Sequence, residues 1–130
     1  MKLFKITTVY AHCDLPCGVY DPMQARLEAA AVLAIMQKYQ EHQDDEVFKT
    51  RALIVKEQRA ELTKRRLWVL WSDYFKPEHL IDYPELHDLF WRATKAASQA
   101  KHSVDPADGQ ALLDLIDEVT KVYDATKSAV

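Results

Sequence analysis

The chain has 130 residues and a mass of 15.0 kDa, of which 48% are hydrophobic and 28% are charged. This is the size of one domain with a hydrophobic core of its own. The net charge of -3 is spread over segments of mixed sign, which excludes the basic face that nucleic-acid binding requires. Only two glycines interrupt long stretches rich in Ala, Leu, Glu, Lys and Gln, so the composition predicts an all-α protein.

Residues 1–11 carry Lys2 and Lys5, but Lys5 and two threonines break their apolar stretch, so they do not form a convincing secretory signal. No apolar run anywhere in the chain approaches the length needed to cross a bilayer. We therefore expect a cytoplasmic protein without a membrane partner.

Both cysteines lie in the segment YAHCDLPCGVYDP, where His12 directly precedes Cys13 and Cys17 follows four residues later. Pro16 prevents a helix through the two cysteines, and Gly18 permits a turn immediately after the second one. The segment can therefore form a hook whose two sulfurs bind one metal ion. Thiolates select copper(I), zinc or iron–sulfur clusters and also suit nickel, and a square-planar set of nitrogen and sulfur donors is typical of Ni(II) or Cu(II).

The nitrogen donors depend on where the chain begins. If the bond between Ala11 and His12 is cut, His12 has a free amine. That amine, the Cys13 amide nitrogen and the Cys13 sulfur would then close two adjacent five-membered chelate rings. An internal His12 could offer only its imidazole.

After this segment the pattern predicts four amphipathic helices. Asp21-Pro22 is a start signal for the first helix, and Asp105-Pro106 repeats it for the last. Short connections between the helices favour an antiparallel up-down four-helix bundle. The expected helices lie near residues 22–40, 46–75, 84–101 and 106–126.

The last two helices have clear apolar faces, and Gly109 is a weak point in the first turn of the final one. The face of the third helix contains Leu86, Leu89, Phe90, Ala93, Ala97 and Ala100. The face of the fourth contains Leu112, Leu115, Ile116, Val119, Val122 and Tyr123.

Two charged residues interrupt the apolar faces of the first two helices. Glu28 shares a face with Val32, and Arg59 is expected to face the core from the second helix. Either both side chains reach water across apolar surface, or they form a partly buried pair kept for a purpose, because such pairs seldom offset their desolvation through stability alone. The stripe that contains the arginine runs through Phe48, Ala52, Val55, Arg59 and Leu62.

Residues 12–20, HCDLPCGVY, resemble the N-terminal nickel-binding hook of the nickel-containing superoxide dismutases. Asp21-Pro22, KEQRAEL at 56–62 and WSDYFKP at 71–77 resemble the same family, and the likeness extends over essentially all of the chain after Ala11. The resemblance implies a four-helix bundle, one nickel ion per subunit and a homo-oligomer, namely a hexamer. It also implies disproportionation of superoxide to dioxygen and hydrogen peroxide.

The same resemblance divides the chain into a leader and one domain. Residues 1–11 would be a leader removed by a processing protease, so the uncut chain would be an inactive precursor. The domain, 12–130, would consist of the nickel hook at 12–20 and the helix bundle at 21–130.

The family pattern also assigns site residues. His12 would give an amine nitrogen and an axial imidazole to nickel, Cys13 an amide nitrogen and a thiolate, and Cys17 the second thiolate. Asp14 would support the hook through hydrogen bonds, and Tyr20 would act beside the metal ligands in catalysis.

Three further residues would surround this site. Glu28 and Arg59 would orient the His12 imidazole, which gives a use to the two charges on the apolar faces. Tyr74, together with Tyr20, would line the approach of the small anion.

Two other classes of function are considered. The first is a non-enzymatic redox or metal sensor in which Cys13 and Cys17 cycle between dithiol and disulfide, and full activity without metal would be its signature. The second is a structural zinc module, although the remaining histidines follow no recognised ligand spacing and are typical of surface or capping positions. Those histidines are His42, His79, His87 and His102.

Overall fold

A computed structural model describes residues 18–128, and all the regular elements in this range are helices. The predicted all-α bundle is confirmed, whereas the hook residues up to Cys17 lie outside the described range. Four long helices correspond to the four that were expected. The elements are α1 (Met23–Glu41), α2 (Glu46–Val69), the π-helical turn η1 (Leu70–Tyr74), α3 (His79–Asp82), α4 (Leu86–His102) and α5 (Pro106–Ser128).

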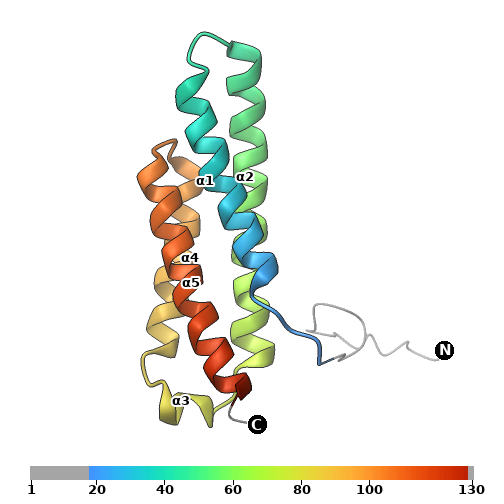
Figure 1. The fold of residues 1–130 in the computed structure, drawn as a ribbon, viewed down its shortest axis with the longest axis vertical. Helices are drawn as coiled ribbons and strands as arrows, with labels where there is room; N and C mark the ends of the chain where they lie inside the picture. The colour runs from blue at the N-terminus through green and yellow to red at the C-terminus, as the bar shows by residue number, and fades with distance from the viewer. Residues whose placement is uncertain (1–17, 129–130) are drawn as a thin grey trace, which may run out of the picture.

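Successive long helices run in opposite directions, as Figure 1 shows. α1 packs against α2 and α5, and α4 packs against the same two helices, which closes the four-helix arrangement. The hairpin of α1 and α2 projects beyond the connection between α4 and α5. The start of α1, the short α3 and the end of α5 lie toward the opposite end of the bundle (Figure 1). Among the described helices, none combines the length and the hydrophobicity of a membrane span.

Aspartates accept hydrogen bonds from amides in the first turns of α1, α2 and α5, and two of them, Asp21 and Asp105, belong to the Asp-Pro pairs that predicted helix starts. Asp21 accepts a hydrogen bond from the Met23 amide at 2.7 Å, although α1 begins one residue later than expected. Asp45 caps α2 by accepting from the Phe48 amide at 2.9 Å. These bonds satisfy amides that have no partner inside the helix. The short α3 was not predicted, because it occupies the connection that Pro77 and Pro84 flank.

The apolar faces of α4 and α5 contribute most of the core, as their periodicity predicts. All six expected residues of α4 are buried. On α5 the residues Leu112, Ile116, Val119 and Tyr123 are buried, with Leu115 and Val122 partly buried beside them.

The face expected for α2 was only partly right, because Ala52 is its one buried residue. Val55 is exposed and Arg59 lies at the edge of the core, because the helix is rotated so that Lys56 points inward instead. The small residues beside Lys56 let α2 approach its neighbours closely. The buried residues of α2 are Ala52, Lys56, Ala60, Thr63 and Leu67.

Lys56 is buried because its ammonium closes the C-terminal end of α4. Its Nζ donates to the main-chain oxygens of Ala100 at 2.7 Å, Lys101 at 2.7 Å and Ser103 at 2.6 Å. These carbonyls lack helical partners, and a positive charge is favourable at that end of a helix. Burial lowers the pKa of Lys56, and the nearby Glu57 carboxylate opposes this effect.

Gly109 lies where α5 packs tightly against α1, and its replacement tests this packing. A Cβ at this position would lie 2.9 Å from the Sδ of Met36 and 3.0 Å from the Cα of Leu33. Because one of these atoms belongs to the backbone, overpacking in Gly109→Ala should cost about 2–3 kcal/mol. The better helix propensity of alanine offsets about 1 kcal/mol of this, so we expect the free energy of unfolding to fall by about 1–2 kcal/mol.

Urea denaturation measures this difference. Gln110→Ala, at the exposed neighbouring position, is the matched control and should change the unfolding free energy by no more than about 0.5 kcal/mol. A Gly109→Ala protein as stable as the parent would show that α1 can move away at little cost.

Candidate metal site and its surroundings

The segment that joins the cysteine-containing hook to α1 is residues 18–22, which we call the root. Gly18 has a φ of 67°, so the chain makes the left-handed turn expected directly after Cys17. At the other end of the root, Pro22 is fully buried. His12, Cys13, Asp14 and Cys17 lie outside the described residues, and their roles stay predictions.

Tyr20 and Tyr74, which were expected to line one approach, lie next to each other. Their ring centroids are 5.9 Å apart and their planes are inclined by 57°. Tyr74 ends the η1 turn, in which the Phe75 amide donates to the Leu70 oxygen at 3.1 Å over five residues. Such π-helical turns often occur at functional sites because they redirect side chains. Here the turn changes the helical register immediately before Tyr74.

The last turns of α5 complete this tyrosine cluster. Tyr123 lies 4.7 Å from Tyr74 between ring centroids, and its hydroxyl donates to the main-chain oxygen of Tyr20. The hydroxyls of Tyr74 and Thr126 are 3.0 Å apart. Lys127 donates to the Tyr123 hydroxyl at 3.2 Å, and this hydrogen bond raises the pKa of Lys127.

Sequence reasoning missed Tyr123, Thr126 and Lys127 as neighbours of the site. A signal was present in Tyr123, because a buried tyrosine needs a partner for its hydroxyl. What the sequence could not indicate was that this partner lies 103 residues away.

The expected proximity of Glu28 and Arg59 is confirmed. Nη1 of Arg59 lies 3.1 Å from Oε2 and 3.4 Å from Oε1 of Glu28, which joins α2 to α1. The side chains are 40% and 21% exposed, respectively, so the pair is only partly shielded from water. One nitrogen faces both oxygens, which differs from the two-nitrogen fork that arginine often forms with carboxylates.

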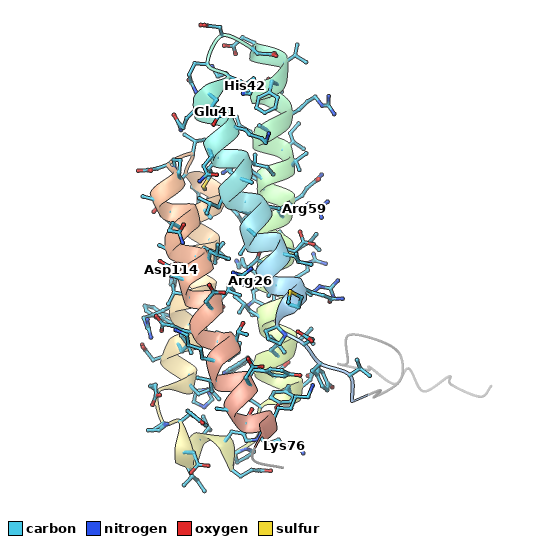
Figure 2. All side chains as sticks on the ribbon, viewed as in Figure 1. Arg26, Glu41, His42, Arg59, Lys76 and Asp114 are labelled. Atoms are coloured by element: carbon cyan, nitrogen blue, oxygen red, sulfur yellow. The ribbon has the colours of Figure 1, made fainter. Side chains whose placement is uncertain are left out.

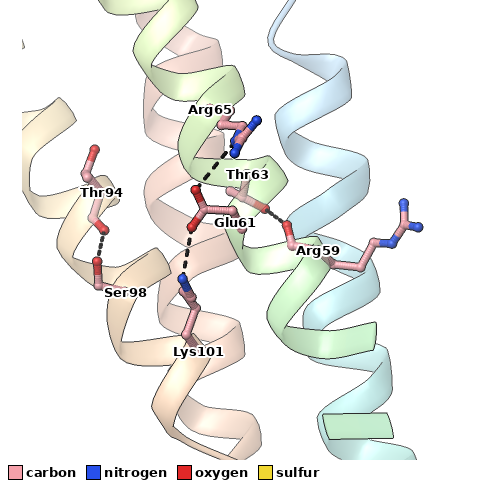
Figure 3. Close-up of polar contacts among 7 residues, drawn as sticks. All are labelled: Arg59, Glu61, Thr63, Arg65, Thr94, Ser98 and Lys101. Carbon is pink, nitrogen blue, oxygen red and sulfur yellow. Dashed lines mark hydrogen bonds and ion pairs between the residues drawn. The ribbon is translucent and has the colours of Figure 1, made fainter. Parts of the chain in front are cut away.

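The neighbouring carboxylate of α2 has other partners and does not compete for Arg59. Glu61 accepts from Lys101 of α4 at 2.9 Å and pairs with Arg65 at 3.5 Å. The hydrogen bond from Lys101 lowers the pKa of Glu61. Figure 3 shows Glu61 on the α4 side of α2, while the Arg59 side chain extends on the α1 side. Thr63 donates to the Arg59 main-chain oxygen at 2.9 Å.

The ion pair and the tyrosine cluster lie at different heights along the bundle. Glu28 comes five residues after the first residue of α1, so it lies about 8 Å along the helix from that end. Figure 2 shows Arg59 nearer to the α1–α2 turn than Arg26, with Lys76 toward the opposite end. The pair Glu28–Arg59 and the pair Tyr20–Tyr74 therefore lie at two different levels along the bundle and do not form one compact group.

Three of the remaining histidines have partners that explain their positions. His42 Nδ1 lies 2.8 Å from the Lys38 oxygen, and His79 Nδ1 accepts from the Lys76 amide at 3.1 Å. His87 Nδ1 accepts from the indole of Trp71 at 2.9 Å. Within residues 18–128, no three His, Cys, Asp or Glu side chains form a group that could hold a metal ion.

The donors in residues 12–17 do suit a metal ion. Two thiolates with nitrogen donors fit nickel in its square-planar geometry. The described root also fits such a hook, since it turns at Gly18 and is fixed at Pro22.

The described residues form an up-down helical bundle, and the segment that precedes it in the sequence contains His12, Cys13 and Cys17, whose donors suit a metal ion. The family model of nickel-containing superoxide dismutase matches residues 7–127. The chain belongs to this family.

Individual relatives agree with this assignment. The nickel superoxide dismutase of Streptomyces seoulensis is 59% identical over 121 residues, covering 93% of this chain and 92% of the relative. That of Streptomyces coelicolor is 57% identical over 122 residues, covering 94% and 92%. A native structure of nickel superoxide dismutase is 57% identical, with a TM-score of 0.86 over 89% of this chain and 99% of the solved one. A structure whose nickel ligation corresponds to the oxidized state is 58% identical, with a TM-score of 0.86 over 90% and 99%.

Proposed function

We propose that the chain is the precursor of an enzyme that disproportionates superoxide to dioxygen and hydrogen peroxide with one nickel ion per subunit. The observation that carries the proposal is the family match over residues 7–127, a range that contains both cysteines and all of the described bundle except the last residue of α5. Cleavage before His12 would remove residues 1–11 and leave a single domain, 12–130.

When bound, nickel supplies a one-electron couple that accepts an electron from one superoxide and returns one to the next. The protein would supply ligands that bring the reduction potential of this couple into the range that the reaction needs. These ligands would be the amine and imidazole of His12, the amide nitrogen and thiolate of Cys13, and the thiolate of Cys17. Anionic thiolate and amidate donors favour the higher oxidation state. Coordination and restricted access would also protect both sulfurs from oxidation by peroxide.

Glu28 and Arg59 are proposed to hold the His12 imidazole in one orientation. A carboxylate that accepts the second ring N–H of a ligating histidine fixes its tautomer and its direction. The ion pair supports this role because Arg59 uses one nitrogen for Glu28, and a guanidinium has five N–H donors in all. Arg59 can thus fix Glu28 and still donate to a further acceptor.

Tyr20 and Tyr74 are proposed to line the path of superoxide, and Asp14 to brace the hook. The contact between the two rings at the root supports their part of this proposal. The two rings would line one side of the path that a small anion takes to the metal.

We also propose that the chain assembles into a hexamer, that a protease removes residues 1–11, and that the protein is located in the cytoplasm. Exposed apolar side chains on α2, namely Val47, Ile54 and Val55, support contacts between subunits. The α1–α2 hairpin that carries Val47 projects from the bundle, where it could reach a neighbouring copy (Figure 1).

The test is superoxide disproportionation by the chain that begins at His12, measured before and after nickel is added. We expect activity only with nickel, and no activity when Cys13 and Cys17 are both replaced by serine. Full activity of the metal-free protein would contradict the proposal and support the thiol redox sensor instead.

A further inference from the structure

The root is held at several points, and one of them comes from the far end of the sequence. Pro22 is buried, Asp21 caps α1, and the Tyr20 ring contacts Tyr74. In addition, the hydroxyl of Tyr123 donates to the main-chain oxygen of Tyr20. The final turns of α5 are thus joined directly to the backbone three residues after Cys17.

The chemistry of Tyr123 indicates that its hydroxyl serves the root and not the core. The side chain is 3% exposed and belongs to the hydrophobic core. Phenylalanine would pack there without a polar group that needs a partner. The Tyr20 carbonyl lies three residues before the first residue of α1 and accepts the proton of the Tyr123 hydroxyl.

The surrounding contacts fix this hydroxyl in place. Lys127 donates to its oxygen at 3.2 Å, which leaves its proton for the Tyr20 carbonyl. Thr126 contacts the Tyr74 hydroxyl at 3.0 Å and also donates to the Tyr123 main-chain oxygen at 2.8 Å. One turn of α5 therefore holds both the root and Tyr74.

We propose that Tyr123 is a positioning residue for the metal-binding hook. Its hydroxyl fixes the Tyr20 carbonyl and so limits how far the root can move the two cysteine ligands away from the bundle. The inference rests on the proposed function, because it concerns the retention of nickel by that same site.

Tyr123→Phe removes only the hydroxyl, and nickel release is the primary measurement. The nickel-loaded chain that begins at His12 is mixed with excess chelator, and nickel loss is followed over time. We expect release about tenfold faster than in the parent, as for other groups that orient metal ligands. Tyr83→Phe is the matched control, because the Tyr83 hydroxyl makes no hydrogen bond that the structure shows within residues 18–128. It should leave release unchanged.

Urea denaturation separates positioning from a purely structural role. Tyr123→Phe breaks a hydrogen bond and Tyr83→Phe breaks none, so Tyr123→Phe should lower the urea midpoint slightly more, but both variants should be fully folded in the urea-free buffer of the nickel measurement. Release within about twofold of the parent would overturn the proposal, and so would a Tyr123→Phe chain that does not fold.

Hydrogen exchange of the metal-free protein makes the test independent of the proposed function. Backbone amides of the root should exchange faster in Tyr123→Phe, with no change in α2 and α4. Unchanged exchange at the root would overturn the positioning role. If the parent binds no nickel but the root still exchanges faster in the variant, the proposed function fails and the role of Tyr123 stands.

Discussion

The chain that still carries residues 1–11 is expected to disproportionate superoxide at least about 100-fold more slowly than the chain that begins at His12, with nickel supplied to both. In the uncut chain the nitrogen of His12 belongs to an amide bond with Ala11, so it is a poor donor until its proton is lost. Loss of a group that merely orients a ligand costs about 10- to 100-fold, and loss of a donor should cost at least as much. Because ligands must be free and deprotonated, nickel affinity is tied to processing.

A chain that begins at Ala11 separates the two effects of the leader. It removes almost all the added bulk but keeps the amide bond to His12. We expect it to behave like the uncut chain in activity and to bind less nickel than the processed form by metal analysis. Equal activity of the uncut and processed chains would show that the His12 amine is not a ligand.

Arg59→Ala is expected to lower nickel-dependent activity by about 10- to 100-fold while it changes folding stability little. The activity falls because Glu28 loses the group that fixes it and can no longer orient the His12 imidazole. The stability change should be about 1 kcal/mol or less, since the Arg59 and Glu28 side chains are 40% and 21% exposed and water screens them. Steady-state rates and urea denaturation on the same preparations measure both quantities.

Arg26→Ala is the matched control for this experiment. Arg26 pairs with Asp117 at 2.7 Å between α1 and α5, and the two side chains are 41% and 39% exposed. It should therefore show a similar stability change with nearly full activity. If Arg59→Ala loses stability but keeps its activity, the pair with Glu28 is structural and does not act on the site.

The sequence by itself determined the features that depend on neighbouring residues. Asp21 and Asp105 mark the predicted helix starts because their side chains reach amides two positions further along the chain. The face of α4 followed from its period alone, because large apolar residues repeat there without interruption. The two cysteines around Pro16 and before Gly18 indicated a metal-binding hook, and the family match places the chain among nickel-containing proteins.

Only the tertiary structure decided the features that join distant segments. The sequence gives no signal that Lys56 is buried, but its ammonium binds the main-chain oxygens at the C-terminal end of α4, and the buried face of α2 contains Lys56 instead of Val55. Gly109 reads as a weak point, but it allows α5 to touch α1. Tyr123 reads as a core residue, but its hydroxyl holds the root. In each case the partner lies more than forty residues away, so no local pattern could specify it.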